Sequence, residues 1–221
     1  MSAILFVLTS HDRMSNGDPT GVWLEEYAVP WTRLTEAGHD VTVASVAGGD
    51  VPVDPNSEPT AEQAREWSEA VERLKDTPAV DRFSAEDFDA VYLPGGHGTM
   101  FDMPDNEGLH ELLLRFDEQG RVLASVCHAP AVFSGMKRRD GQPFIAGRRV
   151  TAFTDSEERA VGGEEKVPFL LETRLRELGA DVSTSGDWAS HVVVDGRLIT
   201  GQNPQSSEAV AGKLLTTLAQ A

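Results

Sequence analysis

The sequence contains one cysteine and has far fewer basic than acidic side chains. Cys127 is the only thiol in 221 residues, so no intramolecular disulfide can form, and an unpaired thiol is typical of a reducing compartment such as the cytoplasm. Lysine and arginine number 19 against 36 aspartates and glutamates, which gives a net charge of −17. Because such a chain repels phosphate backbones and anionic lipid surfaces, we expect neither nucleic acid nor a membrane as a partner.

Long hydrophobic runs and metal-binding patterns are also missing. The first apolar run, Ile4 to Leu8, is far shorter than a signal-peptide core or a membrane span, so it predicts a buried strand. The six histidines show neither a His-Glu-x-x-His pattern nor a neighbouring cysteine pair. We therefore expect no metal site.

Strands and helices alternate along the chain. A length of 221 residues with 40% hydrophobic side chains predicts one domain over residues 1–221. Alternation of the two elements predicts an α/β fold with a mostly parallel central sheet, helices on both faces and one antiparallel hairpin. The expected strands are 4–8, 39–45, 90–93, 122–126, 149–152, 181–185 and the hairpin 191–200. The expected helices are 21–38, 61–75, 106–119, 129–136, 167–178 and one that opens at Asn203, with an acidic loop over 155–165.

Cys127 follows directly on the buried strand 122–126, where a helix is expected to begin. Functional groups of a parallel sheet gather where strands end and helices start. A helix N-terminus favours a thiolate, so this position predicts a nucleophile whose pKa lies below that of a free cysteine. The alternative is an inert buried cysteine, since free cysteine is among the most buried residue types.

Two further segments contain candidate functional residues. Gly95 and Gly96 lie in the turn after strand 90–93, where backbone N–H groups can point into an oxyanion site, although an ordinary tight turn is the alternative. Glu26 falls on the apolar side of helix 21–38, whereas Glu25 points elsewhere. Burial would raise the pKa of Glu26 and let it exchange a proton with a thiol, and a solvated side chain is the alternative.

Taken together, these segments resemble a known family. The chain is similar over nearly its whole length to the DJ-1/PfpI superfamily, within the class I glutamine amidotransferase-like fold. The nearest branch looks like the chaperone-associated glyoxalase III enzymes. The resemblance implies a flavodoxin-like three-layer sandwich and a homodimer. It rests on Thr20–Pro30 (TGVWLEEYAVP), Leu93–Gly98 (LPGGHG), Ser125–Pro130 (SVCHAP), Thr151–Glu158 (TAFTDSEE) and Thr200–Ser206 (TGQNPQS).

The resemblance assigns roles to particular residues. Cys127 matches the nucleophile, His128 the adjacent imidazole and Glu26 the carboxylate that contacts the thiol. The backbone N–H groups of Gly96 and His128 would bind an oxyanion, in the turn that also contains Gly95.

The third member of the implied triad is an acidic residue after Phe-Thr-Asp. Glu158 is the best match, and Asp155 or Glu157 are the alternatives, because Ser156-Glu157-Glu158 departs slightly from the family pattern. We expect Trp23 and Trp188 to shape the pocket.

The implied reaction is a glutathione-independent glyoxalase reaction. The thiol adds to a 2-oxoaldehyde such as methylglyoxal, a base, Glu26 or His128, moves a proton between the two carbons, and water releases D-lactate. These steps need no metal and no organic cofactor. The rival functions are another cysteine hydrolase, such as a protease or an amidotransferase, and a stress chaperone or redox sensor without turnover.

Overall fold

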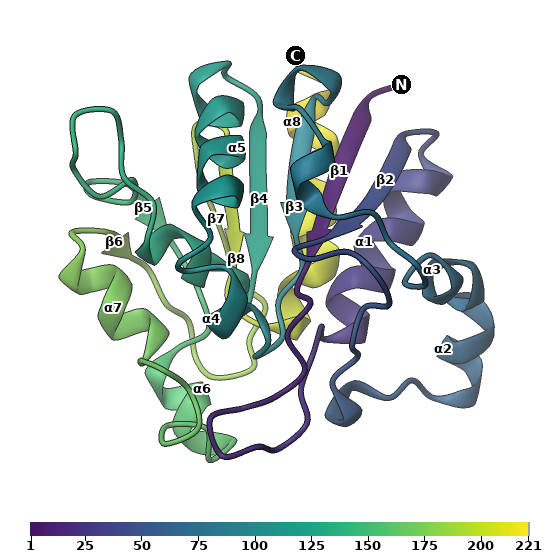
Figure 1. Cartoon of the computed structure of the whole chain (residues 1–221), viewed down its shortest axis with the longest axis horizontal. Helices are drawn as coiled ribbons and strands as arrows, with labels where there is room; N and C mark the ends of the chain where they lie inside the picture. The colour runs from purple at the N-terminus through teal and green to yellow at the C-terminus, as the bar shows by residue number, and fades with distance from the viewer. Residues whose placement is uncertain (221) are drawn as a thin grey trace.

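The computed structural model describes residues 1–220 and contains a six-stranded sheet with helices on both faces (Figure 1). The strand order is β2-β1-β3-β4-β8-β7, and every neighbouring pair is parallel except β7 and β8. This arrangement confirms the expected fold class. The strands are β1 (Ala3–Leu8), β2 (Asp40–Ser45), β3 (Ala90–Leu93), β4 (Val122–Val126), β7 (Val192–Asp195) and β8 (Leu198–Gly201).

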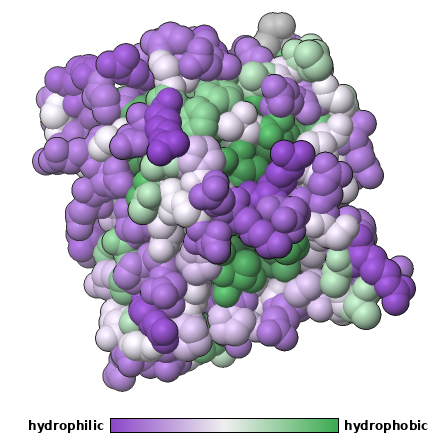
Figure 2. Space-filling view, turned by 45° about the vertical axis from the view of Figure 1, so that its right-hand side comes forward, coloured by the Kyte–Doolittle hydropathy of each residue, from purple (hydrophilic) through white to green (hydrophobic). Residues whose placement is uncertain are grey.

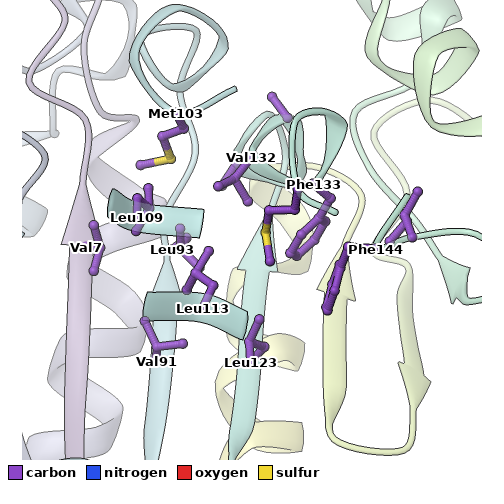
Figure 3. Close-up of a cluster of buried hydrophobic side chains, with 14 of the residues drawn as sticks. Val7, Val91, Leu93, Met103, Leu109, Leu113, Leu123, Val132, Phe133 and Phe144 are labelled. Carbon is purple, nitrogen blue, oxygen red and sulfur yellow. The ribbon is translucent and has the colours of Figure 1, made fainter. Parts of the chain in front are cut away.

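The central strands are apolar on both sides because helices cover both faces of the sheet. In β1, Leu5 and Val7 point into one cluster of buried side chains, whereas Ile4, Phe6 and Leu8 point into the other. Figure 3 shows the first cluster, in which Val7, Val91 and Leu123 of the sheet lie near Leu113 of a covering helix. A strand that is buried on both faces needs apolar residues at consecutive positions, and the sequence has such a run in β1.

Helix α5 (Glu107–Glu118) covers one face, and α1 (Leu24–Glu36) and α8 (Ser207–Leu218) cover the other. The remaining helices lie around the sheet edges and the loops. They are α2 (Ala61–Glu66), α3 (Ser68–Glu72), α4 (Thr99–Asp102), α6 (Asp155–Ala160) and α7 (Leu171–Glu177), with 3₁₀ helices at Pro55–Ser57, Val80–Arg82, Ala85–Asp87, Ala129–Ser134 and Pro204–Ser206.

Three local expectations are wrong. The helix expected over 61–75 is divided into α2 and α3 at Trp67, whose side chain is buried in the core. The helix expected over 129–136 is a short 3₁₀ helix. The acidic loop expected over 155–165 begins with α6, whose first turn is capped reciprocally by Thr154 and Glu157.

The minor strands also differ from expectation. Residues 149–152 and 181–185 contribute only β5 (Arg149–Val150) and β6 (Asp181–Val182), which pair with each other in a separate two-stranded sheet. The Asp-Gly hairpin is confirmed, because β7 and β8 pair antiparallel and Gly196 adopts a positive φ of 61° in the turn.

The exterior agrees with the acidic composition. Figure 2 presents a face that is mostly hydrophilic, with hydrophobic residues visible in patches between the polar ones. No helix within residues 1–220 has the length and apolar character needed to cross a bilayer.

Leu214 belongs to α8, which packs on the same face of the sheet as α1. It is fully buried, while its neighbour Leu215 is only partly buried. We expect Leu214→Ala to lower the free energy of unfolding by about 2–5 kcal/mol, because it removes buried methyl groups and leaves a cavity. Leu215→Ala should cost less than half as much. Denaturant unfolding measures both values, and equal losses would contradict the assigned orientation of α8.

Candidate active site

The side chains singled out in the sequence meet at the carboxyl ends of the parallel strands, the lower edge of the sheet in Figure 1. Cys127 is the first residue after β4, and the turn 94–98 follows the neighbouring strand β3. Glu26 comes from the first turn of α1 and Glu158 from α6. In an open parallel sheet this edge is where ligands bind.

Cys127 lies at a sharp turn. Its φ is 60°, which a residue other than glycine rarely adopts, and its N–H donates to the carbonyl of Gly201 at 2.9 Å. Backbone strain of this kind persists only where the surrounding structure holds it. The following turn then carries the chain into the 3₁₀ helix Ala129–Ser134.

The expected low pKa of the thiol is wrong. Cys127 is only 3% exposed, and burial raises the pKa of its thiol well above the usual value. The neighbouring Glu26 carboxyl raises this pKa further, whereas the backbone N–H of Gly96 lowers it. No regular α-helix begins at this turn to oppose these effects. The resting thiol is therefore protonated and needs a base.

His128 and Glu158 supply a chain of contacts to that thiol. Nδ1 of His128 lies 3.2 Å from Sγ of Cys127, and Nε2 lies 2.7 Å from Oε2 of Glu158. Burial lowers the pKa of His128, and so does the nearby His97. Since Nε2–H faces a carboxylate, the neutral ring presents Nδ1 as an acceptor to the thiol.

Glu158 is ionised despite its burial. Burial alone would raise the pKa of this carboxyl, but electrostatic attraction to the adjacent His128 ring and hydrogen bonds from His128 and His97 hold the pKa well below its usual range. An ionised carboxylate in this position fixes the orientation of His128 and stabilises its imidazolium form.

The two alternatives to Glu158 are engaged elsewhere. Asp155 accepts hydrogen bonds from the backbone and side chain of Thr173, at the start of α7. Glu157 is completely buried and accepts five hydrogen bonds. Its donors are the backbone and hydroxyl of Thr154, the backbone of Trp188 and the side-chain amides of Gln202 and Asn203.

Gly163 makes room for Glu158. A Cβ atom at this glycine would lie 1.8 Å from Oε1 of Glu158, so any side chain would displace the carboxylate. Gly163 was not among the residues expected at the site. Its only signal was the glycine pair 162–163 within an acidic segment, which is typical of an ordinary turn.

Glu26 is fully buried beside the thiol. Its Oε2 accepts the N–H of Gly95 at 2.8 Å, and Oε1 has no hydrogen-bond partner within residues 1–220. Burial raises the pKa of Glu26 to about 8, despite the opposing contacts with Cys127 and Gly95. Glu26 is thus mostly protonated at neutral pH, and the prediction that burial raises its pKa is confirmed.

The two glycines of the turn play different parts. The N–H of Gly95 is occupied by Glu26 and is not free to bind an oxyanion, which corrects its assignment to the oxyanion site. The N–H of Gly96 faces the sulfur of Cys127. Gly96 has a φ of 102°, and a Cβ there would lie 2.2 Å from the carbonyl of Gly21, so only glycine fits. The backbone N–H of His128 meets no acceptor among residues 1–220.

A cavity of about 330 Å³ opens beside this cluster. Trp23, Asn56, His97, Gly163 and Lys166 are among the residues that line it. Trp23 therefore shapes the pocket as expected. Trp188 is not one of the lining residues, although its indole lies 5.8 Å from the ring of Phe153, which packs on His128.

His97 is a second residue of the site that sequence reasoning missed. Its Nε2 lies 2.8 Å from Oε1 of Glu158, and its ring centroid lies 4.0 Å from that of His128. His97, His128 and Glu158 are donor types that bind Zn²⁺, and their ligand atoms lie within 4.8 Å of one another. Each imidazole is hydrogen-bonded to one oxygen of Glu158, however, so the three residues form a hydrogen-bonded network.

The fold, together with a buried cysteine at a sharp turn, defines an α/β protein with a single thiol at the end of a central strand. Residues 20–217 match the DJ-1/PfpI family, and the chain belongs to that family.

Individual relatives and solved structures align with most of the chain. Glyoxalase 3 of Candida albicans is 29% identical, over 94% of this chain and 94% of that protein. Glutathione-independent glyoxalase hsp3101 of Schizosaccharomyces pombe is 30% identical, over 89% and 86%. The crystal structure of glyoxalase III from Candida albicans aligns with a TM-score of 0.88 at 29% identity, over 97% of this chain and 96% of that one. The Rapid Encystment Protein 24 kDa of Francisella tularensis aligns with a TM-score of 0.93 at 34% identity, over 99% of each chain.

The raised pKa of Glu26 predicts how stability depends on pH. The carboxyl titrates near 4.5 when unfolded and near 8 in the fold, so the folded state retains a proton that the unfolded chain releases. This stabilisation is complete below about pH 4.5 and is lost as the pH rises through about 8. We therefore expect the wild type to lose stability relative to Glu26→Gln between about pH 5 and pH 9, measured by denaturant unfolding.

Glu25→Gln is the control for this measurement. Burial also raises the pKa of Glu25, but its side chain is only partly buried, so the change with pH should be smaller. If stability falls in parallel for the wild type and Glu26→Gln, the folded state does not hold the extra proton on Glu26.

Proposed function

We propose that the protein is a glutathione-independent glyoxalase that converts methylglyoxal and related 2-oxoaldehydes into 2-hydroxy acids, with D-lactate as the product from methylglyoxal. One observation carries the proposal: a buried thiol lies between a neutral imidazole backed by an ionised carboxylate and a protonated carboxyl group. Relatives over nearly the full length of the chain are named as glyoxalases of this kind.

His128 generates the nucleophile. As the sulfur of Cys127 adds to the aldehyde carbon, Nδ1 of His128 takes the thiol proton, and Glu158 stabilises the imidazolium that forms. The aldehyde oxygen becomes an alkoxide, which the backbone N–H groups of Gly96 and His128 can stabilise. Glu26 then gives its proton to this oxygen and completes a hemithioacetal.

Glu26 next acts as a base. Now ionised, it takes a proton from the first carbon, which leaves an enediolate, and returns this proton to the second carbon, while the hydroxyl proton passes from the first oxygen to the second. A carboxyl with a pKa of about 8 can both give and take a proton near neutral pH. The product of this step is a thioester of Cys127. Water then adds its hydroxyl to the thioester carbon and gives its other proton to Glu26, and the sulfur leaves with the proton that His128 holds, which releases the 2-hydroxy acid and restores the starting site.

The proposal extends to the cofactor requirement, the oligomeric state and the location of the protein. Each step is an addition, a proton transfer or a hydrolysis, so we propose that neither a metal ion nor an organic cofactor takes part. We also propose a homodimer, which the family resemblance implies, and a cytoplasmic location, which suits an acidic chain with one unpaired thiol.

Turnover of methylglyoxal without glutathione tests the function. We expect the wild type to form D-lactate, with activity unaffected by a chelator, and Cys127→Ala to lose more than about 10³-fold in rate because no nucleophile remains. A wild type that forms no D-lactate, while Cys127 is readily oxidised by peroxide, would favour a redox sensor or a chaperone instead.

Glu26 and Glu25 form a matched pair for the proton transfer. Glu26→Gln keeps the shape of the side chain but cannot titrate, so we expect turnover to fall by about 10²- to 10⁴-fold. Glu25→Gln should change the rate only a few-fold. Alkylation of Cys127 reports whether the thiol stays accessible in both variants. Small and equal effects on turnover would exclude Glu26 as the proton carrier.

A further inference from the structure

The proposed reaction moves two protons within the hemithioacetal, one between its two carbons and one between the oxygens on those carbons. One is the carbon-bound hydrogen, which Glu26 carries. The other is bound to oxygen: the hydroxyl proton of the hemithioacetal must leave the first oxygen, and the second oxygen must become a hydroxyl. His128 holds the former thiol proton during this stage, and Glu26 is occupied with the carbon-bound hydrogen. The oxygen-bound proton therefore needs another carrier.

His97 is placed to be that carrier. Cys127, His128, Glu26 and Glu158 are each at most 3% exposed, whereas the side chain of His97 is 16% exposed and lines the cavity. The centroid of its ring lies 4.0 Å from that of the His128 ring, and His128 contacts the sulfur, so a group bound to the sulfur lies close to His97.

The two ring nitrogens of His97 have different surroundings. Nε2 lies 2.8 Å from Oε1 of Glu158 and donates its proton to that ionised carboxylate. Nδ1 has no hydrogen-bond partner in the part of the chain that the structure describes. In the neutral ring Nδ1 is then an acceptor, and Glu158 stabilises the imidazolium that forms when Nδ1 takes a proton.

We propose that His97 is a catalytic residue whose Nδ1 carries the hydroxyl proton between the two neighbouring oxygens of the enediolate. Nδ1 takes the proton from the first oxygen, whose O–H bond breaks, and gives it to the second oxygen, where a new O–H bond forms. No oxidant or reductant is needed, and His97 ends in its starting state. Glu158 thus serves two imidazoles with separate tasks: His128 acts on the thiol and His97 acts on the substrate.

The inference rests on the proposed glyoxalase function, and His97→Gln tests it. Glutamine retains an N–H that can donate to Glu158 but cannot carry a proton. We expect the kcat for D-lactate formation to fall at least about 100-fold, while the alkylation rate of Cys127 stays within about two-fold of the wild type. His39→Gln, at the amino end of β2 and so at the opposite edge of the sheet, is the control and should keep wild-type turnover.

His97→Ala provides a second measurement. The missing ring leaves space, so added imidazole should restore part of the turnover of this variant and none of that of His97→Gln. Unfolding curves check that both variants remain folded.

The outcomes separate this inference from the function on which it rests. If the wild type forms no D-lactate, the proposed function fails. If the wild type is active and His97→Gln retains turnover within a few-fold, the function stands and the role of His97 is overturned. If turnover by His97→Gln is slow and its Cys127 also alkylates slowly, His97 only positions Glu158 and His128, and the proposal is overturned. The proposal is also overturned if added imidazole does not rescue turnover by His97→Ala.

Discussion

Glu158 accepts hydrogen bonds from two imidazoles, at 2.7 Å and 2.8 Å, and the loops around it are arranged to keep this buried carboxylate ionised. The isolated charge would be costly in an apolar interior, and the two N–H donors offset that cost. Gly163 leaves the space for one of its oxygens, and the capped first turn of α6 fixes its backbone. The two imidazoles come from other segments: His128 lies just after strand β4, and His97 lies in the turn after β3.

Two adjacent glutamates have unrelated tasks because neighbouring residues on a helix point about 100° apart. Glu158 contacts the imidazoles of His128 and His97. Glu157 faces the loop after β8, where it binds Asn203 and Gln202, and it also accepts the backbone N–H of Trp188. The buried Glu157 connects α6 to that loop. Since α6 carries Glu158, the position of the acidic residue depends on a contact with the C-terminal part of the chain.

The sequence predicted the features that depend on local pattern. Apolar runs predicted the central strands, and the Asp-Gly turn predicted the hairpin. The apolar side of α1 predicted that Glu26 is buried. The missed features depend on packing between distant segments. The thiol pKa follows from burial and from Glu26, which is a hundred residues away along the chain. His97 and Gly163 acquire their significance only where the loop after α6 meets the turn after β3.

The burial of the reacting groups separates them from the ionic atmosphere of the solvent. At physiological ionic strength, salt screens charges at the surface beyond about 8 Å, and it screens buried pairs much less. With a net charge of −17, the exterior carries mutual repulsion that added salt weakens. The hydrogen bonds between Glu158 and its two imidazoles lie outside this effect. Ionic strength therefore acts on the stability of the whole fold while leaving the electrostatics around Cys127 nearly constant.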